Sequence, residues 1–222
     1  MTVCDKILTF YQGLEPPAGL DNTIQILNPY NDEDAWNLTR QFYHQYYNDH
    51  NERTILFGIN PGRFGGGLTG VPFTDPVHME VVCGIANNLD KRAELSSSFI
   101  YEMIQACGGP ETFYARYYIS SVSPLGFVQD GKNLNYYDIK GYKELFFDYA
   151  RKQIEKQMDL PINRKVAYSI GKGTNIKFLH LLNKEFGLFE KILPVPHPRW
   201  VMQYRLKRKQ EFIDEYRKVL GF

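Results

Sequence analysis

The segment from Gly58 to Phe73 has the composition of a loop that brings its backbone close to another group. Six of its first thirteen residues are glycine, at positions 58, 62, 65, 66, 67 and 70. Glycine has no side chain to hold a ligand away from the backbone, and it adopts positive φ readily. The loop also carries a carboxamide at Asn60 and an aromatic ring at Phe73. Phosphate binding alone would not explain these two side chains. The pattern predicts contact with a ligand, and a structural turn is the alternative.

A second candidate segment follows His197, which lies between two prolines. Five of residues 199–209 are basic and none is acidic. Such a stretch suits contact with the phosphates of a nucleic acid. The alternatives are a solvated helix face for residues 207–209 and, for His197, a histidine that is hydrogen-bonded to the backbone at the end of a strand.

Four segments resemble motifs of the uracil-DNA glycosylase superfamily, and of its single-strand-selective monofunctional branch in particular. Residues 58–73 contain Gly-Ile-Asn-Pro-Gly, Phe-Gly and Thr-Gly-Val-Pro-Phe, as in motif 1 of that branch, with Ile59 in place of a methionine. Residues 195–198, Val-Pro-His-Pro, are similar to motif 2. Residues 121–125 and 131–134 are weaker matches to two further elements of the branch.

The resemblance implies a DNA glycosylase that hydrolyses the N-glycosidic bond of uracil, leaves an abasic site and takes part in base excision repair. In this role Asn60 positions the attacking water, because an amide is not a useful general base at neutral pH. His197 donates a hydrogen bond to the oxyanion that develops on the leaving base. The base must first be flipped out of the duplex. The two main motifs contain no lysine to form a Schiff base, so the expected enzyme is monofunctional.

The same resemblance implies a base pocket and a DNA-contacting surface. Phe73 would stack on the base, an interaction worth about 1–3 kcal/mol, and Gly62 would leave room for a base substituent or a water. The expected base-binding residues are Ile59, Gly62, Phe73, Ser121 and Ser123. The residues expected to contact phosphates, or to fill the gap that the flipped base leaves, are Arg63, Lys132, Asn133, Arg199, Trp200, Gln203, Tyr204 and Arg205. A core position for Trp200 is the alternative.

Position 121 departs from the family pattern. The family has an asparagine there that reads the amide edge of uracil, whereas this chain has Ser121, whose shorter hydroxyl can donate or accept. A wrong base then leaves fewer fixed polar groups unpaired, so we expect a wider range of deaminated bases, including xanthine beside uracil. The alternative is a serine that caps a turn, with Ser120 or Ser123 in the base-reading role.

The elements that position these segments alternate between strands and helices. Short apolar or β-branched runs predict strands at residues 54–58, 113–122, 165–170 and 189–195. Helices are predicted at residues 4–11, 32–50, 78–91, 95–107, 137–156, 176–186 and 204–219. This order predicts one domain over residues 1–222, an α/β/α three-layer sandwich with a central, mainly parallel four-stranded sheet. Ligands bind beyond the carboxyl ends of such strands, where the candidate segments fall.

The composition limits the class of protein. The chain has 26 Lys and Arg against 25 Asp and Glu, so affinity for DNA must come from a local patch. Cys4, Cys83 and Cys107 are far apart, which argues against a four-cysteine metal or iron–sulfur site and against a disulfide framework. No apolar run approaches the ~18 residues of a membrane span. We expect a cytoplasmic monomer, associated with the nucleoid if bacterial, that binds single- or double-stranded DNA without a metal, cofactor or membrane.

Two other functions stay open at this point. The first is a catalytically weak nucleic-acid-binding module of the same fold. The second is an unrelated hydrolase that uses the glycine-rich loop to bind an anion, although the chain has no Gly-x-Ser-x-Gly nucleophile motif.

Overall fold

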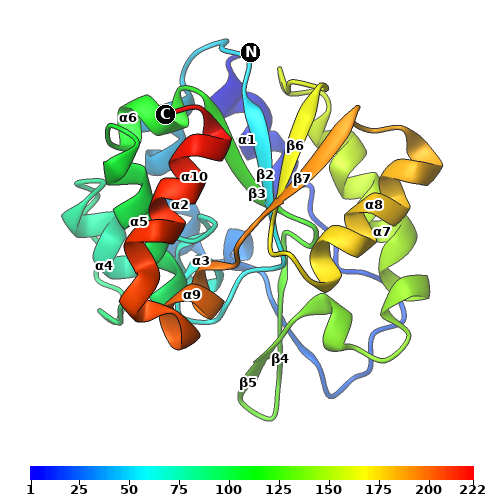
Figure 1. Ribbon diagram of the computed structural model, residues 1–222. Helices are drawn as coiled ribbons and strands as arrows, with labels where there is room; N and C mark the ends of the chain where they lie inside the picture. Colours follow the sequence, from blue (N-terminus) through cyan, green and yellow to red (C-terminus); the bar gives the residue numbers. More distant parts are fainter.

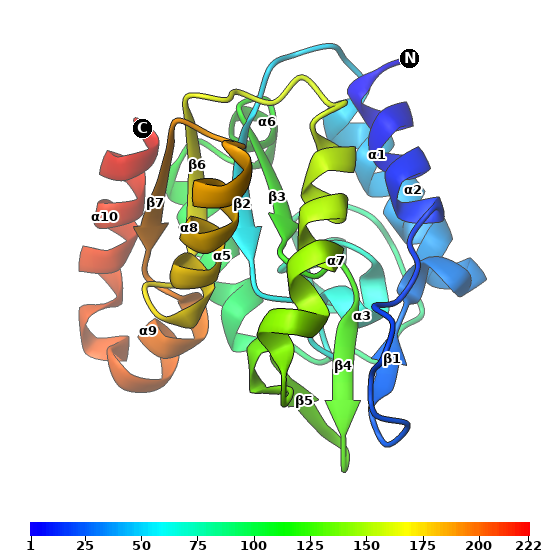
Figure 2. The same cartoon turned by 90° about the vertical axis from the view of Figure 1, so that its right-hand side faces the viewer.

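The computed structural model describes residues 1–222 and has a four-stranded parallel sheet at its centre (Figure 1). Its strand order is β3-β2-β6-β7, with β2 Thr54–Gly58, β3 Tyr117–Ser121, β6 Val166–Ile170 and β7 Lys191–Val195. Helices α5 (Leu95–Ala106) and α10 (Lys209–Leu220) cover one face, and α7 (Tyr142–Gln157) and α8 (Thr174–Phe186) cover the other (Figures 1 and 2). The predicted three-layer sandwich is confirmed, and its central sheet is parallel throughout.

The central strands are apolar because helices cover both of their sides. Strand β3 is buried along its whole length, and β2 is buried except at Thr54. Gly58 and Ser121 pair with each other in the last positions of β2 and β3. Strands β6 and β7 likewise end together, at the pair Ile170–Val195. The segments that follow these strands therefore leave the sheet at the same edge.

The remaining helices are short or lie beside the sheet. They are α1 Val3–Gln12, α2 Glu33–Tyr47, α3 Gly66–Thr69, α4 Pro76–Val81, α6 Pro110–Tyr114 and α9 Pro198–Tyr204. Three single turns of 3₁₀-helix are η1 Pro29–Asn31, η2 Tyr136–Asp138 and η3 Leu206–Arg208. No helix combines the length and the apolar character that a membrane span requires.

A second, antiparallel sheet, which was not predicted from the sequence, lies beyond the carboxyl ends of the central strands. Its order is β1-β4-β5, with β1 Gln25–Leu27, β4 Gly126–Gln129 and β5 Lys132–Leu134. The β4–β5 hairpin turns at Asp130 and Gly131, which both have positive φ (49° and 68°). Asp-Gly is a strongly preferred pair for such a two-residue turn, so the signal was present in the sequence. Figure 2 shows this hairpin projecting below the central sheet.

Several predicted boundaries were wrong for local reasons. The helix expected at residues 78–91 ends at Val81, shortly before Gly84 with φ +70°. The strand expected at residues 113–122 begins only at Tyr117, because residues 113 and 114 end helix α6, for whose first turn Pro110 is well suited. The helix expected from residue 137 begins at Tyr142, after Gly141 with φ +73°. The helix expected at residues 204–219 begins only at Lys209, after the turn η3, and Tyr204 is instead the last residue of α9.

Candidate active site

A cavity of about 80 Å³ lies where β2, β3 and β7 end. Asn60 and Phe73 reach it from the glycine-rich loop after β2, Ser121 from the last position of β3, and His197 from the residues after β7. The parallel register explains this convergence, because the three strands end at the same edge of the sheet. Residues that are far apart in the sequence thus face one space.

The carboxamide of Asn60 is held by the backbone of the last residue of β5 and of the turn η2 that follows it. Its Oδ1 accepts the N–H of Tyr136 at 2.8 Å, and its Nδ2 donates to the carbonyl of Leu134 at 3.0 Å. These two bonds determine which end of the amide is oxygen. Oδ1 keeps one free lone pair, while Nδ2 also lies 3.4 Å from the carbonyl of Pro61, as a weak second donor contact. The group can therefore orient a water molecule, but it cannot remove a proton from it.

His197 is the N-cap of helix α9, and this role determines its tautomer. Its Nδ1 accepts the backbone N–H of Arg199 at 3.2 Å, so the proton of the neutral ring is on Nε2. Burial, aided by the charge of Arg199, lowers the pKa of His197 to about 4. At neutral pH the ring is an uncharged donor. Its orientation is fixed before any ligand arrives.

Phe73 has an unusual backbone conformation, with φ at +53°. Bulky residues rarely adopt it, at a cost of roughly 1–3 kcal/mol, and such residues concentrate at functional sites. The Phe73 ring lies 6.4 Å from the His197 ring, centroid to centroid. A Cβ added to Gly58 would lie 2.8 Å from the Phe73 ring and 3.2 Å from Oγ of Ser121. Glycine at position 58 is therefore what lets the ring lie at the end of β2.

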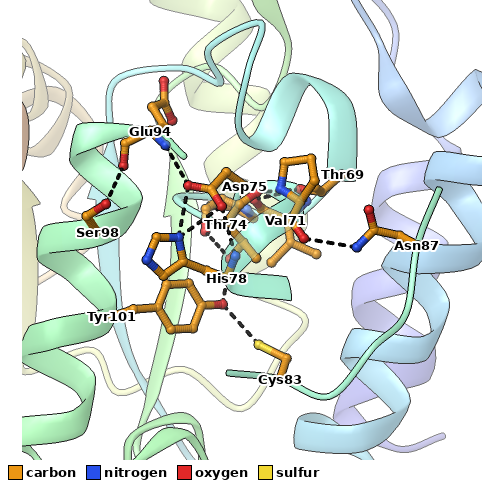
Figure 3. A network of polar contacts seen from close by, with 12 residues as sticks. Thr69, Val71, Thr74, Asp75, His78, Cys83, Asn87, Glu94, Ser98 and Tyr101 are labelled. Carbon is orange, nitrogen blue, oxygen red and sulfur yellow. Dashed lines mark hydrogen bonds and ion pairs between the residues drawn. The ribbon is translucent and has the colours of Figure 1, made fainter. Parts of the chain in front are cut away.

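Two threonines hold the loop around Phe73. Thr69 donates to the carbonyl of Thr74 at 2.7 Å. The Thr74 hydroxyl donates to the carbonyl of Pro72 at 3.2 Å and lies 2.9 Å from the hydroxyl of Tyr101 (Figure 3). Both threonines are fully buried. Their hydrogen bonds therefore hold the strained turn at Phe73 in place from the interior of the protein.

The two serines that were expected to bind the base lie in different places. Ser121 lines the cavity, and its hydroxyl forms no hydrogen bond within the protein, which leaves it free for a ligand and argues against a capping role. Ser123 is fully buried outside the cavity and donates to the carbonyl of Leu125 at 2.8 Å. The structure thus places Ser123 in the internal bonding of its own turn. Ser120 is buried as well, and its hydroxyl has no partner. Ile59 and Gly62 line the cavity as expected.

A basic groove of about 470 Å³ opens beside the cavity. Of the expected DNA-contacting residues, Arg63, Lys132, Asn133 and Arg199 line it. Arg92, which the sequence analysis did not single out, adds a fourth cation. The guanidinium groups of Arg63 and Arg92 lie 4.5 and 3.8 Å from the centre of the Phe64 ring. This ring therefore holds two cations at the groove.

A larger groove of about 670 Å³ opens next to His197. Arg199, Trp200, Gln203 and Tyr204 line it, together with the turn at residues 171–173. The Trp200 ring packs edge-on against Phe212 at 5.6 Å and is still 40% exposed, so it is only partly a core residue. Arg205 lies outside both grooves, with its guanidinium 5.0 Å from the Trp200 ring.

Several residues that line the cavity were not predicted from the sequence. The most prominent is Glu94, just before α5, whose pKa is raised by burial and by the nearby Asp75, and lowered in part by Arg199. Nothing in its sequence neighbourhood marks this glutamate. The backbone groups of Leu134 and Tyr136 that hold Asn60 were also missed, because backbone contacts carry no signal in residue type.

Comparison with known proteins identifies the family and the fold of this chain. The family model described as the uracil DNA glycosylase superfamily matches residues 44–221. Among solved structures, the crystal structure of wild-type SMUG2 from Pedobacter heparinus is similar to this chain, with 41% sequence identity and a TM-score of 0.96. The match covers 100% of this chain and 97% of the SMUG2 chain.

Proposed function

The chain belongs to the uracil-DNA glycosylase superfamily, and from that premise we propose that it is a monofunctional enzyme that removes uracil from DNA and leaves an abasic site. One observation carries the proposal: the fixed carboxamide of Asn60, the neutral imidazole of His197 and the Phe73 ring line one cavity. We place its action in base excision repair on cytoplasmic DNA, at the nucleoid if the cell is bacterial, with the protein acting as a monomer.

In the proposed reaction the bond between C1′ and the base nitrogen breaks, and its electron pair leaves with the base. The negative charge that reaches the uracil O2 is stabilised by the Nε2–H of His197, which needs no reorganisation because Nδ1 is already bonded. Asn60 orients the water that adds to the electron-poor C1′. The proton that this water loses balances the charge of the departed base.

The surroundings of the cavity suit a flipped nucleotide. The Phe73 ring offers a face for stacking, and the two grooves that adjoin the cavity carry cations for the phosphates. Trp200 and Tyr204 line the larger groove and are 40% and 65% exposed, so either can enter the gap that the flipped base leaves. We infer that both single- and double-stranded DNA containing uracil can bind.

We also infer a range of bases wider than uracil, including xanthine. The support is the unpartnered hydroxyl of Ser121 in the cavity, which can donate to one base and accept from another. An asparagine introduced by Ser121→Asn would present one fixed acceptor and one fixed donor. The variant should raise the rate for uracil relative to xanthine. An unchanged ratio between the two bases would contradict this role of Ser121.

The function is tested with single- and double-stranded oligonucleotides that contain one uracil. After incubation, alkali cleaves the strand wherever an abasic site has formed. We expect cleavage with the wild type, loss of cleavage with Asn60→Ala, and no change with Asn37→Ala, an exposed asparagine on α2. Binding of either substrate without any abasic product would show a nucleic-acid-binding module instead.

A further inference from the structure

Two polar groups without protein partners, the carboxylate of Glu94 and Nδ2 of Asn133, face the space beside Gly62. The carboxylate of Glu94 forms no hydrogen bond and no ion pair within the protein, and Nδ2 of Asn133 donates to no protein group, although both residues line the cavity. A Cβ added to Gly62 would lie 2.9 Å from Oε1 of Glu94 and 3.2 Å from Nδ2 of Asn133. An acceptor and a donor therefore converge on the volume that this glycine leaves open.

The orientation of the Asn133 amide is fixed. Its Oδ1 accepts the backbone N–H of Arg63 at 3.1 Å. The NH₂ group must then be the end that approaches Gly62, as the distances show. Asn133 is thus a donor in this wall, and Glu94 is an acceptor when it is ionised.

The backbone of Glu94 is held by a buried network (Figure 3). Its N–H donates to Oδ2 of Asp75 at 2.7 Å, and its carbonyl accepts from the hydroxyl of Ser98 at 3.1 Å. Asp75 is fully buried and also accepts the backbone N–H of His78 at 2.9 Å. Figure 3 shows the Glu94 carboxylate pointing away from Asp75. Asp75 therefore positions Glu94 without neutralising its carboxylate.

Two glycines, Gly62 and Gly65, lie next to the carboxylate of Glu94. A side chain at Gly65 would collide with Oε2 of Glu94, just as one at Gly62 would crowd Oε1. Two glycines thus leave room for a carboxylate that gains no bond from the protein. A half-buried carboxylate without a hydrogen-bond partner is unfavourable, and the charge of Arg199 offsets this cost only in part. A ligand that brings an N–H or O–H group would supply the missing hydrogen bond.

We propose that Glu94 and Asn133 form a base-reading pair, in which the carboxylate accepts a hydrogen bond from a polar group of the flipped base and the amide donates to a lone pair beside it. The pair rests on the proposed function and extends it to specificity. It favours a base with a hydroxyl or another group that both donates and accepts on the edge facing Gly62, and it disfavours a base with an apolar group there.

The test compares oligonucleotides that carry uracil, 5-hydroxyuracil or thymine in the same sequence, under single-turnover conditions. Wild type should release 5-hydroxyuracil faster than thymine. Glu94→Gln keeps the shape but removes the negative charge and one acceptor. We expect it to lower the rate for 5-hydroxyuracil relative to uracil at least about tenfold, the worth of a hydrogen bond to a charged group. Asn133→Asp, which keeps the bond to Arg63 and removes the donor, should lower the same ratio.

Controls separate this role from a structural one. Glu185→Gln, at an exposed glutamate on α8, should leave all three rates unchanged. If the wild type is active but Glu94→Gln leaves the ratio of the 5-hydroxyuracil rate to the uracil rate unchanged, the base-reading pair is wrong and the proposed function stands. The same holds if Glu94→Gln lowers the rate equally for every base. A wild type that releases none of the bases overturns the pair together with the proposed function.

Discussion

The backbone N–H of Tyr136 donates to Oδ1 of Asn60 at 2.8 Å, although the two residues are 76 positions apart. Together with the bond from Nδ2 of Asn60 to the Leu134 carbonyl, it joins the glycine-rich loop to the end of β5 and to the turn η2 that follows. The end of the β4–β5 hairpin therefore determines how the carboxamide of Asn60 is oriented toward the cavity.

This relationship predicts that an acid at position 60 will not improve the enzyme. Asn60→Asp keeps the acceptor for Tyr136 but places a carboxylate oxygen against the Leu134 carbonyl, which also only accepts. We expect a free energy of unfolding about 1–3 kcal/mol lower at pH 7, and no gain in rate at that pH. The new carboxyl should have a raised pKa, so the stability loss should shrink at acidic pH, where the protonated group can donate. Thermal unfolding and single-turnover rates at several pH values check this, and a faster, equally stable variant at pH 7 would contradict it.

His197 should act as a neutral donor over the whole working pH range. His197→Ala should lower the rate about 10²–10³-fold, as for the loss of one oxyanion donor. Exposed His44 on α2 offers a matched control, His44→Ala. Because the folded pKa is about 4, below the ordinary 6.5, the contribution of His197 to stability should fall as pH drops from about 6.5 to 4. The plot of rate against pH should therefore show no decrease near pH 6 to 7 that is caused by protonation of His197. A decrease in that range that is absent in His197→Ala would show that the ring is charged there.

Gly58→Ala should displace the stacking ring while leaving the strand intact. The new methyl group would lie 2.8 Å from the Phe73 ring and 3.2 Å from Oγ of Ser121. We expect a rate about 10- to 100-fold lower, corresponding to the ~1–3 kcal/mol of one stacking interaction. Gly13→Ala, where an added Cβ meets only ordinary contacts, should have wild-type activity. Kinetics for both variants check the prediction, and equal rates would show that the Phe73 ring need not keep its position.

The groove cations should determine how strongly salt weakens DNA binding. Arg63→Ala and Arg199→Ala should each reduce the slope of log K against log salt by about 0.9 for duplex DNA, or about 0.7 for single strands, for each phosphate that the variant no longer neutralises. Lys184→Ala, at an exposed residue near the end of α8, should leave the slope unchanged. Binding titrations between 50 and 200 mM salt, roughly the range where such interactions are visible, measure this. Slopes equal to wild type would place the DNA elsewhere.

Glu94→Gln should stabilise the fold at neutral pH. The pKa of Glu94 is raised, mainly by burial, so its ionised form costs stability above the folded pKa, and this cost disappears below the unfolded value near 4.5. We expect Tm at pH 7 to rise by about 2–4 °C, which corresponds to roughly 1 kcal/mol for a chain of this size. The difference should vanish below about pH 4.5. A lower Tm at pH 7 would mean that the carboxylate supports the structure.

The sequence by itself determined the architecture, because local patterns produce local elements. The apolar run at residues 54–58 predicted β2 with its correct ends, and the alternation of strands and helices predicted the sandwich. The spacing within residues 58–73 pointed to Asn60 and Phe73, and the Val-Pro-His-Pro sequence pointed to His197. These features are short, and they depend on neighbouring residues in the chain.

Only the tertiary structure decided which side chains share the cavity. Ser121 and Ser123 are two residues apart, but the first ends β3 with its hydroxyl free and the second bonds to Leu125. The tautomer of His197 follows from a helix cap, and the amide of Asn60 is oriented by backbone groups of another segment. Glu94 reaches the site through a buried aspartate and two glycines. Such contacts depend on where strands end and how loops cross, and residue type alone does not encode them.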